Sequence, residues 1–432
     1  MENKFKTQVI SDEILDKLSL KNRYSMINNI LMPIFSPEQF HLFKEVQRFC
    51  LRFEKKNNIT HGPNEDVYEW MGAFGKKGYL TRSRAYEVID QNYEQHGLVA
   101  DFLRFLPIDM FDTQFAFVTG ANVLAVNPLY FHHDNIPVRV EALRELVTGE
   151  AVGCVAITEP ERGSDAIHQL TLSEEQEDGS YILNGEKVFQ TNGPKAKWAV
   201  TYATAEKNKG DKMGQFLIDT NWDGWHCERV NIPWIPKIYV GKEKLENLRV
   251  PKDYVLGATG KGRDHLFEGL VDERIGIAQI AMSECWGALV HAMIYVNIRK
   301  QFRQEILKFQ GVGFLLTDLW AQTTNLTLGL IKFCEIFDRK VEKFGGAEKI
   351  PEGVKQAMVA SASQLKYQAC NLSKLVCYES ANLMGGAGLS DNTLVQDYLG
   401  ISRIQEIVGG SRQIQQYIMS MALRTLFKMS IQ

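Results

Sequence analysis

Two short segments in the middle of the chain combine residue types that can bind a flat polar ring. In CVAITEPERGSDAIH (154–168), the hydroxyl groups of Thr158 and Ser164 lie among small residues and close to the carboxylate of Glu159. Backbone amides and hydroxyls in such a loop can hold the edge of a ring or the oxygens of a phosphate. On composition alone, a polar loop that joins a helix to a strand is the commoner meaning of this pattern.

The second segment, GEKVFQTNGPKAKWAV (185–200), places an aromatic ring and a hydroxyl group two residues apart. Phe189 and Thr191 share one face of a predicted strand, because side chains alternate along a strand. This pair suits an aromatic cofactor with a hydrogen-bonding edge. Asn184-Gly185 lies between two β-prone runs and predicts a hairpin turn, since both residues accept a positive φ. Taken alone, the segment is more often only such a hairpin.

Helical, β and again helical blocks must position these segments. Within an expected first domain of residues 1–150, helical periodicity runs from residue 36 to about 150. Residues 151–258 form short β-prone runs separated by turn residues. Residues 259–432 return to long helical patterns whose apolar faces are too wide to stand alone. We therefore expect an α+β fold with an N-terminal helical domain, a small β domain and a C-terminal helical bundle at these boundaries.

The composition excludes several classes of protein. Of the 432 residues, 45% are hydrophobic and 23% are charged, and the net charge of −3 comes without any block of Lys or Arg. The electrostatic footprint of a nucleic-acid binder is therefore absent. Seven scattered cysteines without a CxxC pair disfavour a disulfide framework or a metal site. No signal-like N-terminus and no uninterrupted membrane-spanning apolar run are visible, so we expect a soluble, cytoplasmic protein.

The two middle segments resemble the β-domain signature of the acyl-CoA dehydrogenases. A-I-T-E-P-x-x-G-S-D followed by G-E-K-x-x-x-T-N-G at this spacing carries the resemblance, which extends over about residues 90 to 425. It implies FAD as the cofactor, a β-barrel-like middle domain and a C-terminal four-helix bundle. It also implies that Phe189, where Trp is common, lies against the isoalloxazine and that Thr191 faces N5. The FAD contacts that it implies in the first segment are Ala156, Ile157, Thr158 and Ser164, and Ser164 could bind the pantetheine arm of the substrate instead.

A later segment, RKQFRQEILKFQ (299–310), is similar to the family's R-x-x-F-G…Q motif. In the family this motif reaches the FAD of a neighbouring subunit. The resemblance implies a homotetramer, or a dimer, in which the cofactor contacts are Arg299, Phe302 and Gln310. Arg303 replaces the usual glycine, which leaves the path of this turn open.

Two further glycine-containing segments resemble cofactor contacts of the family. ANLMGGAGL (381–389) is similar to a loop that packs on the adenosine half of FAD, with Asn382 and Gly386 as the implied contacts. Its plain alternative is a turn that ends a helix. Ser411 precedes the final helix and is expected to cap it, and the N-terminus of that helix could favour FAD phosphate oxygens.

The family's reaction needs a carboxylate beside the substrate's Cα while the β-hydrogen leaves as a hydride. Many members carry this Glu in a near-C-terminal E-G-T motif, but the matching stretch IVGGSRQIQQ (407–416) has Gly409 at that position. Other members, such as isovaleryl-CoA and long-chain acyl-CoA dehydrogenases, place the Glu on an earlier helix just before an Arg. That dipeptide is Glu273-Arg274 here, and the small Gly409 would leave room for it. We therefore predict Glu273 as the catalytic base.

Other carboxylates could be mistaken for this base. On a helix, Asp272 points about 100° away from Glu273, so both cannot face one site. Glu268 and Glu406 are weaker rivals. Glu273 itself could be only a solvated first-turn carboxylate, which a helix N-terminus favours.

The resemblance also implies a substrate site. Backbone N–H groups at Gly409 and Gly410 would polarise the thioester carbonyl, and Ser164 and Arg274 complete the implied contacts. The implied reaction is α,β-dehydrogenation of a branched, cyclic or aryl-substituted acyl-CoA, with electrons passed to an electron-transfer flavoprotein. An acyl-CoA oxidase or flavin monooxygenase of the same fold is an alternative, and a non-catalytic helical binding scaffold is another.

Overall fold

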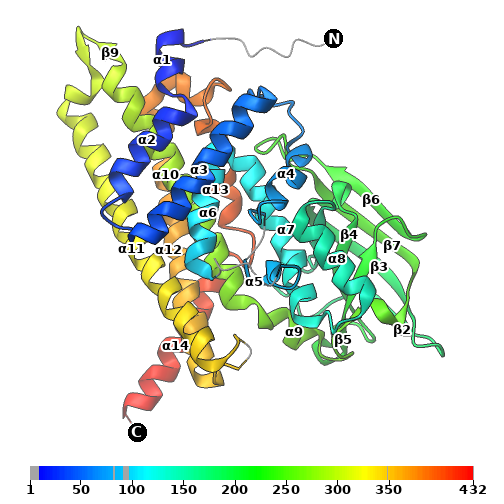
Figure 1. The fold of residues 1–432 in the computed structure, drawn as a ribbon. Coiled ribbons are helices and arrows are strands. Elements are labelled where there is room, and N and C mark those ends of the chain that lie inside the picture. Colours follow the sequence, from blue (N-terminus) through cyan, green and yellow to red (C-terminus); the bar gives the residue numbers. More distant parts are fainter. Residues whose placement is uncertain (1–8, 81–82, 91–96, 348, 432) are drawn as a thin grey trace. The chain divides into compact units, whose positions relative to one another are not determined.

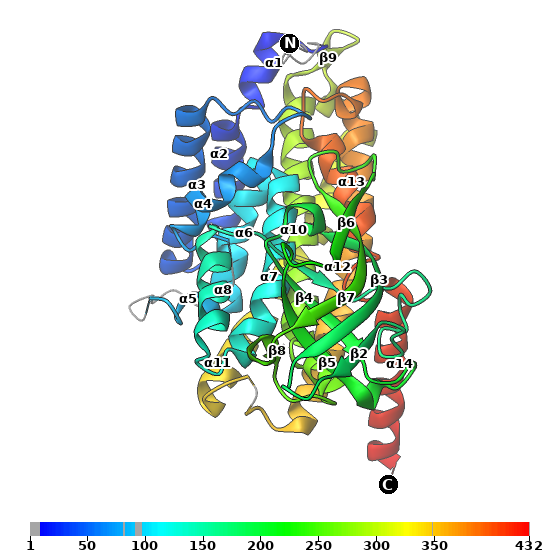
Figure 2. The same ribbon diagram turned by 90° about the vertical axis from the view of Figure 1, so that its right-hand side faces the viewer.

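The structure, a computed structural model, describes residues 9–80, 83–90, 97–347 and 349–431. The chain forms two compact units (Figures 1 and 2). The helical unit consists of Met1–Glu65, Gly97–Phe117 and Arg274–Gln432, and the sheet unit consists of Asp66–His96 and Val118–Glu273. The predicted domain boundaries after residues 150 and 258 stay predictions.

The helical unit contains most of the long helices, two of which, α7 and α10, continue from or into the sheet unit. In chain order its α-helices are α1 (Asp12–Lys17), α2 (Leu20–Leu31), α3 (Pro37–Asn57), α6 (Leu98–Phe111), α7 (Thr113–His132), α10 (Leu270–Ile298), α11 (Gln310–Phe344), α12 (Glu352–Met384), α13 (Val395–Gln405) and α14 (Arg412–Ile431). Short strands β9 (Lys300–Gln301) and β10 (Gln304–Glu305) and the 3-10 turns η5 (Ile306–Lys308) and η6 (Gly385–Leu389) connect them.

Helix α3 shows how local sequence fixes an element of this unit. Its first residue is Pro37, and the Ser36 side chain accepts a hydrogen bond from the Gln39 backbone N–H at 3.2 Å. The Gln39 side chain in turn accepts from the Ser36 N–H at 2.9 Å. This reciprocal capping box satisfies two donors that a helix start leaves unpaired.

Helix α12 lies beside α11 and also packs against α13 and α14 (Figure 1). Its buried residues recur at spacings of three and four, so one stripe faces its neighbours. Among the described residues, one run, Gly262–Ile298, is long and apolar enough by composition to cross a membrane. Charged residues such as Glu284 interrupt this run, so it is not an uninterrupted apolar stretch. Since 94% of its most apolar window is buried, it has the character of a core helix.

The sheet unit places helices around one sheet. Its α-helices besides α7 are α4 (Met71–Gly75), α5 (Ser83–Tyr86), α8 (Pro137–Thr148) and α9 (Gly262–Glu268), and its 3-10 turns are η1 (Val67–Trp70), η2 (Gly193–Lys195), η3 (Gly210–Lys212) and η4 (Lys252–Tyr254). Its strands are β1 (Gly153–Ala156), β2 (Leu172–Glu175), β3 (Tyr181–Thr191), β4 (Trp198–Thr204), β5 (Met213–Asp219), β6 (Trp225–Val230), β7 (Val240–Val250) and β8 (Val255–Leu256).

The eight strands of this sheet follow the order β6-β7-β3-β2-β4-β5-β8, and β1 pairs with β4 (Figure 2). Strand β4 is parallel to β1 and β2, and the other pairs are antiparallel. Side chains of β4 alternate between two cores. Trp198, Val200 and Tyr202 pack with α7 and α8, whereas Ala199 and Ala203 join a second core built from the strands.

The hairpin predicted at Asn184-Gly185 is wrong, because β3 continues through both residues. The register with β7 shifts here: Leu183 pairs with Leu248, and Gly185 pairs with Leu245. Two residues of β7 therefore oppose Asn184, whose side chain accepts a hydrogen bond from the Asn247 N–H at 2.8 Å. The Asn-Gly pair marks a β-bulge between distant strands, and long-range pairing outweighs its local preference for a turn.

Candidate cofactor and substrate site

The structure brings the two predicted cofactor-binding segments side by side. Strand β1 ends at Ala156, and the loop that follows it lies beside β3. The Val188 N–H donates to the Thr158 carbonyl at 2.9 Å, and the Gln190 side-chain amide donates to the same oxygen at 3.3 Å. Segments that are about thirty residues apart in sequence thus share one hydrogen-bonded surface within the sheet unit.

Phe189 is the extra residue of a second bulge in β3. Val188 pairs with Lys242 and Gln190 pairs with Gly241, so no residue of β7 opposes Phe189. Its backbone has φ = 66°, and its side chain is 61% exposed. A bulky residue rarely adopts a positive φ, and such a conformation persists where the surrounding strands enforce it. The bulge therefore turns the ring outward, where an aromatic cofactor could stack on it.

Thr191 ends β3, is partly buried and pairs with Val240. The next residue, Asn192, is fully buried with φ = 72°, and sequence reasoning gave it no role. Its side-chain amide donates to the carbonyls of Val118 (3.1 Å) and Gly153 (3.2 Å). The N-G pair of the motif therefore fixes the strand end that presents Thr191.

A buried ion pair joins the two segments. Lys187 Nζ lies 2.9 Å from Glu159 Oε1, and the two side chains are 0% and 2% exposed. The Glu159 carboxylate also accepts from the N–H groups of Leu170 (2.6 Å) and Thr171 (2.8 Å). Burial raises the pKa of Glu159, but the Lys187 ammonium and these donors outweigh it and lower the pKa below its usual range.

Sequence reasoning missed this pair as a structural link. The alternation of side chains along a strand could have revealed it, because Lys187 lies on the same face of β3 as the buried Leu183. A lysine on a buried face needs a partner, and Glu159 is the carboxylate of the first motif. Lys187 also donates to the Ile157 carbonyl at 3.3 Å, so it holds the loop that carries the expected cofactor contacts.

A third titratable side chain lies near this pair. Glu243, the β7 partner of Lys187, is fully buried, and the Cys227 thiol donates to its Oε1 at 3.4 Å. Burial raises the pKa of Glu243 to about 8. The raised pKa favours the neutral, protonated form of Glu243 at neutral pH. The Lys187 ammonium and the Glu159 carboxylate then balance each other's charge.

The other predicted contacts of the first segment differ in exposure. Ala156 is fully buried at the end of β1, and Ile157 and Thr158 are partly buried. Ser164 is exposed in the loop that follows. These positions suit an elongated ligand that extends from the β3 bulge along the loop. A ring with attached phosphates has this shape.

In the helical unit, the predicted thioester-binding glycines form a fixed loop between α13 and α14. Gly409 and Gly410 have φ values of 60° and 85°, which glycine adopts without a Cβ clash. The Gln415 side-chain amide donates to both carbonyls, at 3.3 Å and 2.8 Å, and Arg274 Nε donates to Gln415 Oε1 at 3.1 Å. Ser411 directly precedes α14, and its carbonyl accepts from the Gln415 N–H, so it stands at the helix start as expected.

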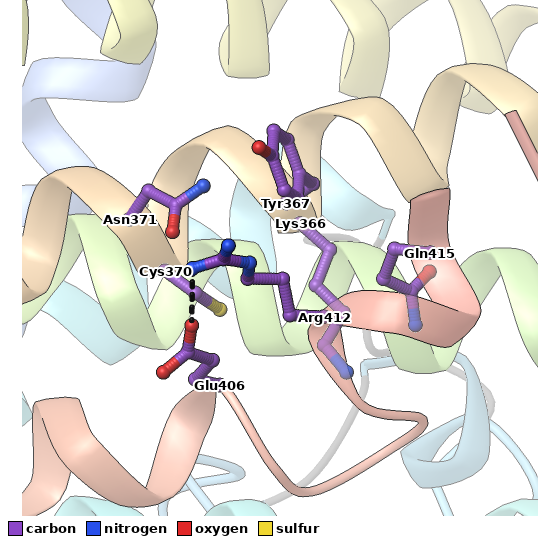
Figure 3. Close-up of a pocket in the computed structure, with 7 residues that line it drawn as sticks. All are labelled: Lys366, Tyr367, Cys370, Asn371, Glu406, Arg412 and Gln415. Carbon is purple, nitrogen blue, oxygen red and sulfur yellow. Dashed lines mark ion pairs between the residues drawn. The ribbon is translucent and has the colours of Figure 1, made fainter. Parts of the chain in front are cut away.

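The rival carboxylate Glu406 is held in ion pairs. Its Oε1 lies 2.6 Å from Lys374 Nζ and 3.5 Å from the Arg412 guanidinium. Figure 3 marks the ion pair with Arg412. Burial raises the pKa of Glu406, but these cations outweigh it and lower the pKa, which makes Glu406 a poor proton acceptor. A small pocket beside it is lined by Lys366, Tyr367, Cys370, Asn371, Glu406, Arg412 and Gln415 (Figure 3).

The segment from Arg299 to Gln310 contains a tight hairpin of β9 and β10. Phe302 and Arg303 occupy its tip with φ values of 50° and 65°. Arg303 therefore takes a conformation that glycine adopts at less cost, and this shows the path of the turn that the sequence left open. Phe302 is 88% exposed, and Arg299 and Gln310 are exposed as well. An exposed aromatic tip suits a contact outside its own unit.

The predicted adenosine loop follows the end of α12. The helix ends at Met384, and Gly385 has φ = 58°, so a helix-ending turn is present. Asn382 and Gly386 are both exposed. The turn and the cofactor contact do not exclude each other, because the contact needs only an accessible backbone.

The predicted base lies in the first turn of α10. Glu273 is partly buried and its neighbour Asp272 is buried. Glu273 is the last residue of the sheet unit, whereas Gly409 belongs to the helical unit. Their proximity stays a prediction, as do the roles of the other predicted site residues. Among the described residues, no group of three or more His, Cys, Asp or Glu side chains could hold a metal.

Comparisons with known proteins identify the family. Residues 154–233 match the middle domain of acyl-CoA dehydrogenases, and residues 260–424 match their C-terminal domain. A short-chain-specific acyl-CoA dehydrogenase of Megasphaera elsdenii is 28% identical over 72% of this chain and 78% of its own. Subunit CarC of the caffeyl-CoA reductase-Etf complex of Acetobacterium woodii is 26% identical over 70% of this chain and 76% of its own.

Solved structures agree with the predicted fold. Butyryl-CoA dehydrogenase of Megasphaera elsdenii superposes with a TM-score of 0.77 at 24% identity, over 90% of this chain and 98% of its own. Structures of the same fold include complexes with FAD and FADH2. The predicted α+β fold class, with its central β domain between helical regions, is confirmed. Since the two domain matches together cover more than half of its residues, the chain belongs to the acyl-CoA dehydrogenase family.

Proposed function

We propose that the chain is an FAD-dependent acyl-CoA dehydrogenase that introduces a double bond between Cα and Cβ of an acyl thioester. The observation that carries this proposal is the joined surface of the two segments in the sheet unit. There the β3 bulge presents the Phe189 ring, and the buried pair of Lys187 with Glu159 holds the neighbouring loop. The bound FAD would supply the hydride-accepting ring that such a dehydrogenation requires.

The chain's own residues would bind and orient the reactants. Thr158 and Thr191 offer hydroxyl groups to the polar edge of the isoalloxazine, and Ala156, Ile157 and Ser164 line the rest of that loop. From a neighbouring subunit, the exposed tip at Phe302, with Arg299 and Gln310, would contact the cofactor. The adenosine half and the phosphates would be held by Asn382, Gly386 and Ser411.

Glu273 would accept the α-proton. A carboxylate beside Cα can do so when the thioester oxygen is stabilised as negative charge develops. Gly409 and Gly410 supply backbone N–H donors for that oxygen, and Arg274 is buried with its Nε on Gln415. The glycine at position 409 and the Glu273-Arg274 dipeptide together support this choice of base.

Electrons would pass to an electron-transfer flavoprotein, and the acyl group would be branched, cyclic or aryl-substituted. The relation to a subunit of a caffeyl-CoA reductase-Etf complex supports both parts, since caffeyl is an aryl-substituted acyl group. A homotetramer, or a dimer, is supported by exposed apolar side chains on the helical unit, such as Phe302 and Phe427. A cytoplasmic location is supported by seven cysteines without disulfide partners.

Anaerobic titration of the purified yellow protein tests the proposal. Straight, branched, cyclic and aryl-substituted acyl-CoAs are added in turn, and the flavin absorbance is followed. Bleaching of the flavin by at least one acyl-CoA, with the enoyl-CoA as product, is the expected result. A yellow protein that no acyl-CoA bleaches would contradict the proposed activity, and so would a protein that binds no FAD. Rapid reoxidation by oxygen with release of peroxide would indicate an oxidase instead.

A further inference from the structure

A single buried lysine binds three consecutive carbonyls of the glycine loop. Lys366 on α12 is 1% exposed, and its Nζ donates to the carbonyl oxygens of Val408, Gly409 (2.7 Å) and Gly410 (2.6 Å). Figure 3 shows its side chain reaching from α12 toward the chain between Glu406 and Arg412. The ammonium has three N–H donors, one for each of these carbonyls.

The three carbonyls determine where three N–H groups point. A trans peptide directs its N–H opposite to its C=O, and the described chain has no cis peptide bond. The carbonyls on Lys366 belong to the same peptide groups as the N–H donors of Gly409, Gly410 and Ser411. Within the described part of the chain, none of these N–H groups has a hydrogen-bond acceptor. Three donors therefore face away from the lysine without an acceptor among the described residues.

The charge of Lys366 acts on these donors through the peptide groups. A cation on a carbonyl oxygen withdraws electron density from the amide, which makes the N–H of the same peptide a stronger donor. Gln415 adds a second donor to the Gly409 and Gly410 carbonyls. Because Lys366 is buried and the loop is partly buried, water screens this effect less than it would at an exposed site.

We propose that Lys366 is a positioning residue that orients and polarises the N–H groups of Gly409 and Gly410 toward the anionic oxygen of the substrate's enolate. This inference rests on the proposed dehydrogenase function. It assigns an indirect role to Lys366, which acts through the backbone of the glycine loop. The sequence signal is the position of Lys366, four residues after the buried Ala362 and four before the buried Cys370, where an apolar residue is expected.

The test measures enolate formation rather than turnover. Acetoacetyl-CoA is a thioester with an acidic α-carbon, and its enolate absorbs in the ultraviolet. It is bound to the FAD-loaded enzyme, and the pH midpoint of its enolisation is read from difference spectra. Lys366→Met keeps the apolar stem and removes the charge, so we expect its midpoint to rise by about one pH unit or more, a tenfold loss of enolate stabilisation. Lys374→Met, in the same helix and paired with Glu406, is the matched control and should keep the wild-type midpoint.

The outcomes separate this inference from the proposed function. An unchanged midpoint in Lys366→Met overturns the inference, even if the variant is less stable. An unchanged midpoint with weaker FAD binding also overturns it and assigns the donors to a cofactor phosphate. If Lys366→Met does not fold, Gln415→Leu replaces it, and a smaller rise of the midpoint is expected, whereas no rise overturns the inference. Failure of the wild-type protein to bind FAD or the thioester would instead contradict the proposed function.

Discussion

Lys187 and Glu159 form a buried ion pair, with 2.9 Å between Nζ and Oε1, that ties strand β3 to the loop after β1. The two residues belong to the two segments that carry the family's β-domain signature. The contact therefore gives a structural role to one charged residue of each segment. It acts together with the hydrogen bonds of Val188 and Gln190 to the Thr158 carbonyl in shaping the expected cofactor surface.

Removing one partner of this pair should be costly. Lys187→Met leaves the Glu159 carboxylate buried without its cation, and we expect a loss of about 3–5 kcal/mol in the free energy of unfolding. The flavin content of the purified protein should fall as well, because the loop loses its anchor. Urea denaturation and the flavin absorbance measure the two effects.

A neighbouring exposed pair provides the control for this variant. Lys242 pairs with Glu186 at 3.3 Å, and both side chains are about half exposed. Lys242→Met should cost at most about 1 kcal/mol. Equal losses in Lys187→Met and Lys242→Met would show that the buried pair has no special role.

The buried Glu243 should make the stability of the protein depend on pH. Its pKa of about 8 in the folded protein lies above the ordinary value of 4.5, so the folded state binds more protons than the unfolded state between these values. The free energy of unfolding should therefore fall as the pH rises from 4.5 to 8. Glu243→Gln, which stays neutral, should be more stable than the wild type at pH 8 by about 2–4 kcal/mol and nearly equal to it near pH 4.5.

Thermal or urea unfolding at several pH values checks this prediction. Glu246 lies on the same strand, is about half exposed and pairs with Lys244, which lowers its pKa. Glu246→Gln is the control and should gain no stability at pH 8. A Glu243→Gln variant that is less stable than the wild type at pH 8 would mean that Glu243 is ionised in the folded protein.

The Phe189 ring should contribute to FAD binding without supporting the fold. Phe189→Gly removes the exposed ring and relieves the positive φ, so the free energy of unfolding of the apoprotein should change by less than about 1 kcal/mol. FAD binding should weaken by about three- to tenfold, which corresponds to the loss of one aromatic contact. Fluorescence titration of the apoprotein with FAD measures it.

Trp234 is a matched control for this variant, since it is another exposed aromatic residue of the sheet unit and lies outside the two segments. Trp234→Ala should leave FAD affinity unchanged. If Phe189→Gly and Trp234→Ala bind FAD as tightly as the wild type, the ring does not lie against the cofactor.

Local sequence was sufficient where a short motif fixes its own conformation. The Ser36 cap and Pro37 define the start of α3 from neighbouring residues alone, and the resemblance of the two segments implied that both contact one cofactor. Asn184-Gly185 failed as a hairpin because its pairing partner, β7, is about sixty residues away, and a local pattern contains no information on such a partner. The bulge that exposes Phe189 could not be predicted either, because it also depends on the pairing of β3 with β7.

Buried charges were the other part that the sequence did not reveal. Lys187 and Lys366 each stand on a buried face, and each finds its partners on a different segment of the chain. A lysine is usually expected to be exposed to solvent. Only the fold shows the carboxylate or the carbonyls that lie opposite these two. By contrast, Glu273 was predicted because Gly409 stands where many family members have the catalytic Glu. That prediction needed only sequence positions and no knowledge of packing.

The central claim is that Glu273 removes the α-proton, and anaerobic reduction of the flavin by an acyl-CoA that bleaches the wild-type enzyme tests it most directly. Glu273→Gln should bind FAD as the wild type does and show no bleaching, because its amide cannot accept the proton. Asp272→Asn, which alters the adjacent carboxylate, should still be bleached. Bleaching of Glu273→Gln at the wild-type rate, or its loss only in Asp272→Asn, would contradict the assignment of the base.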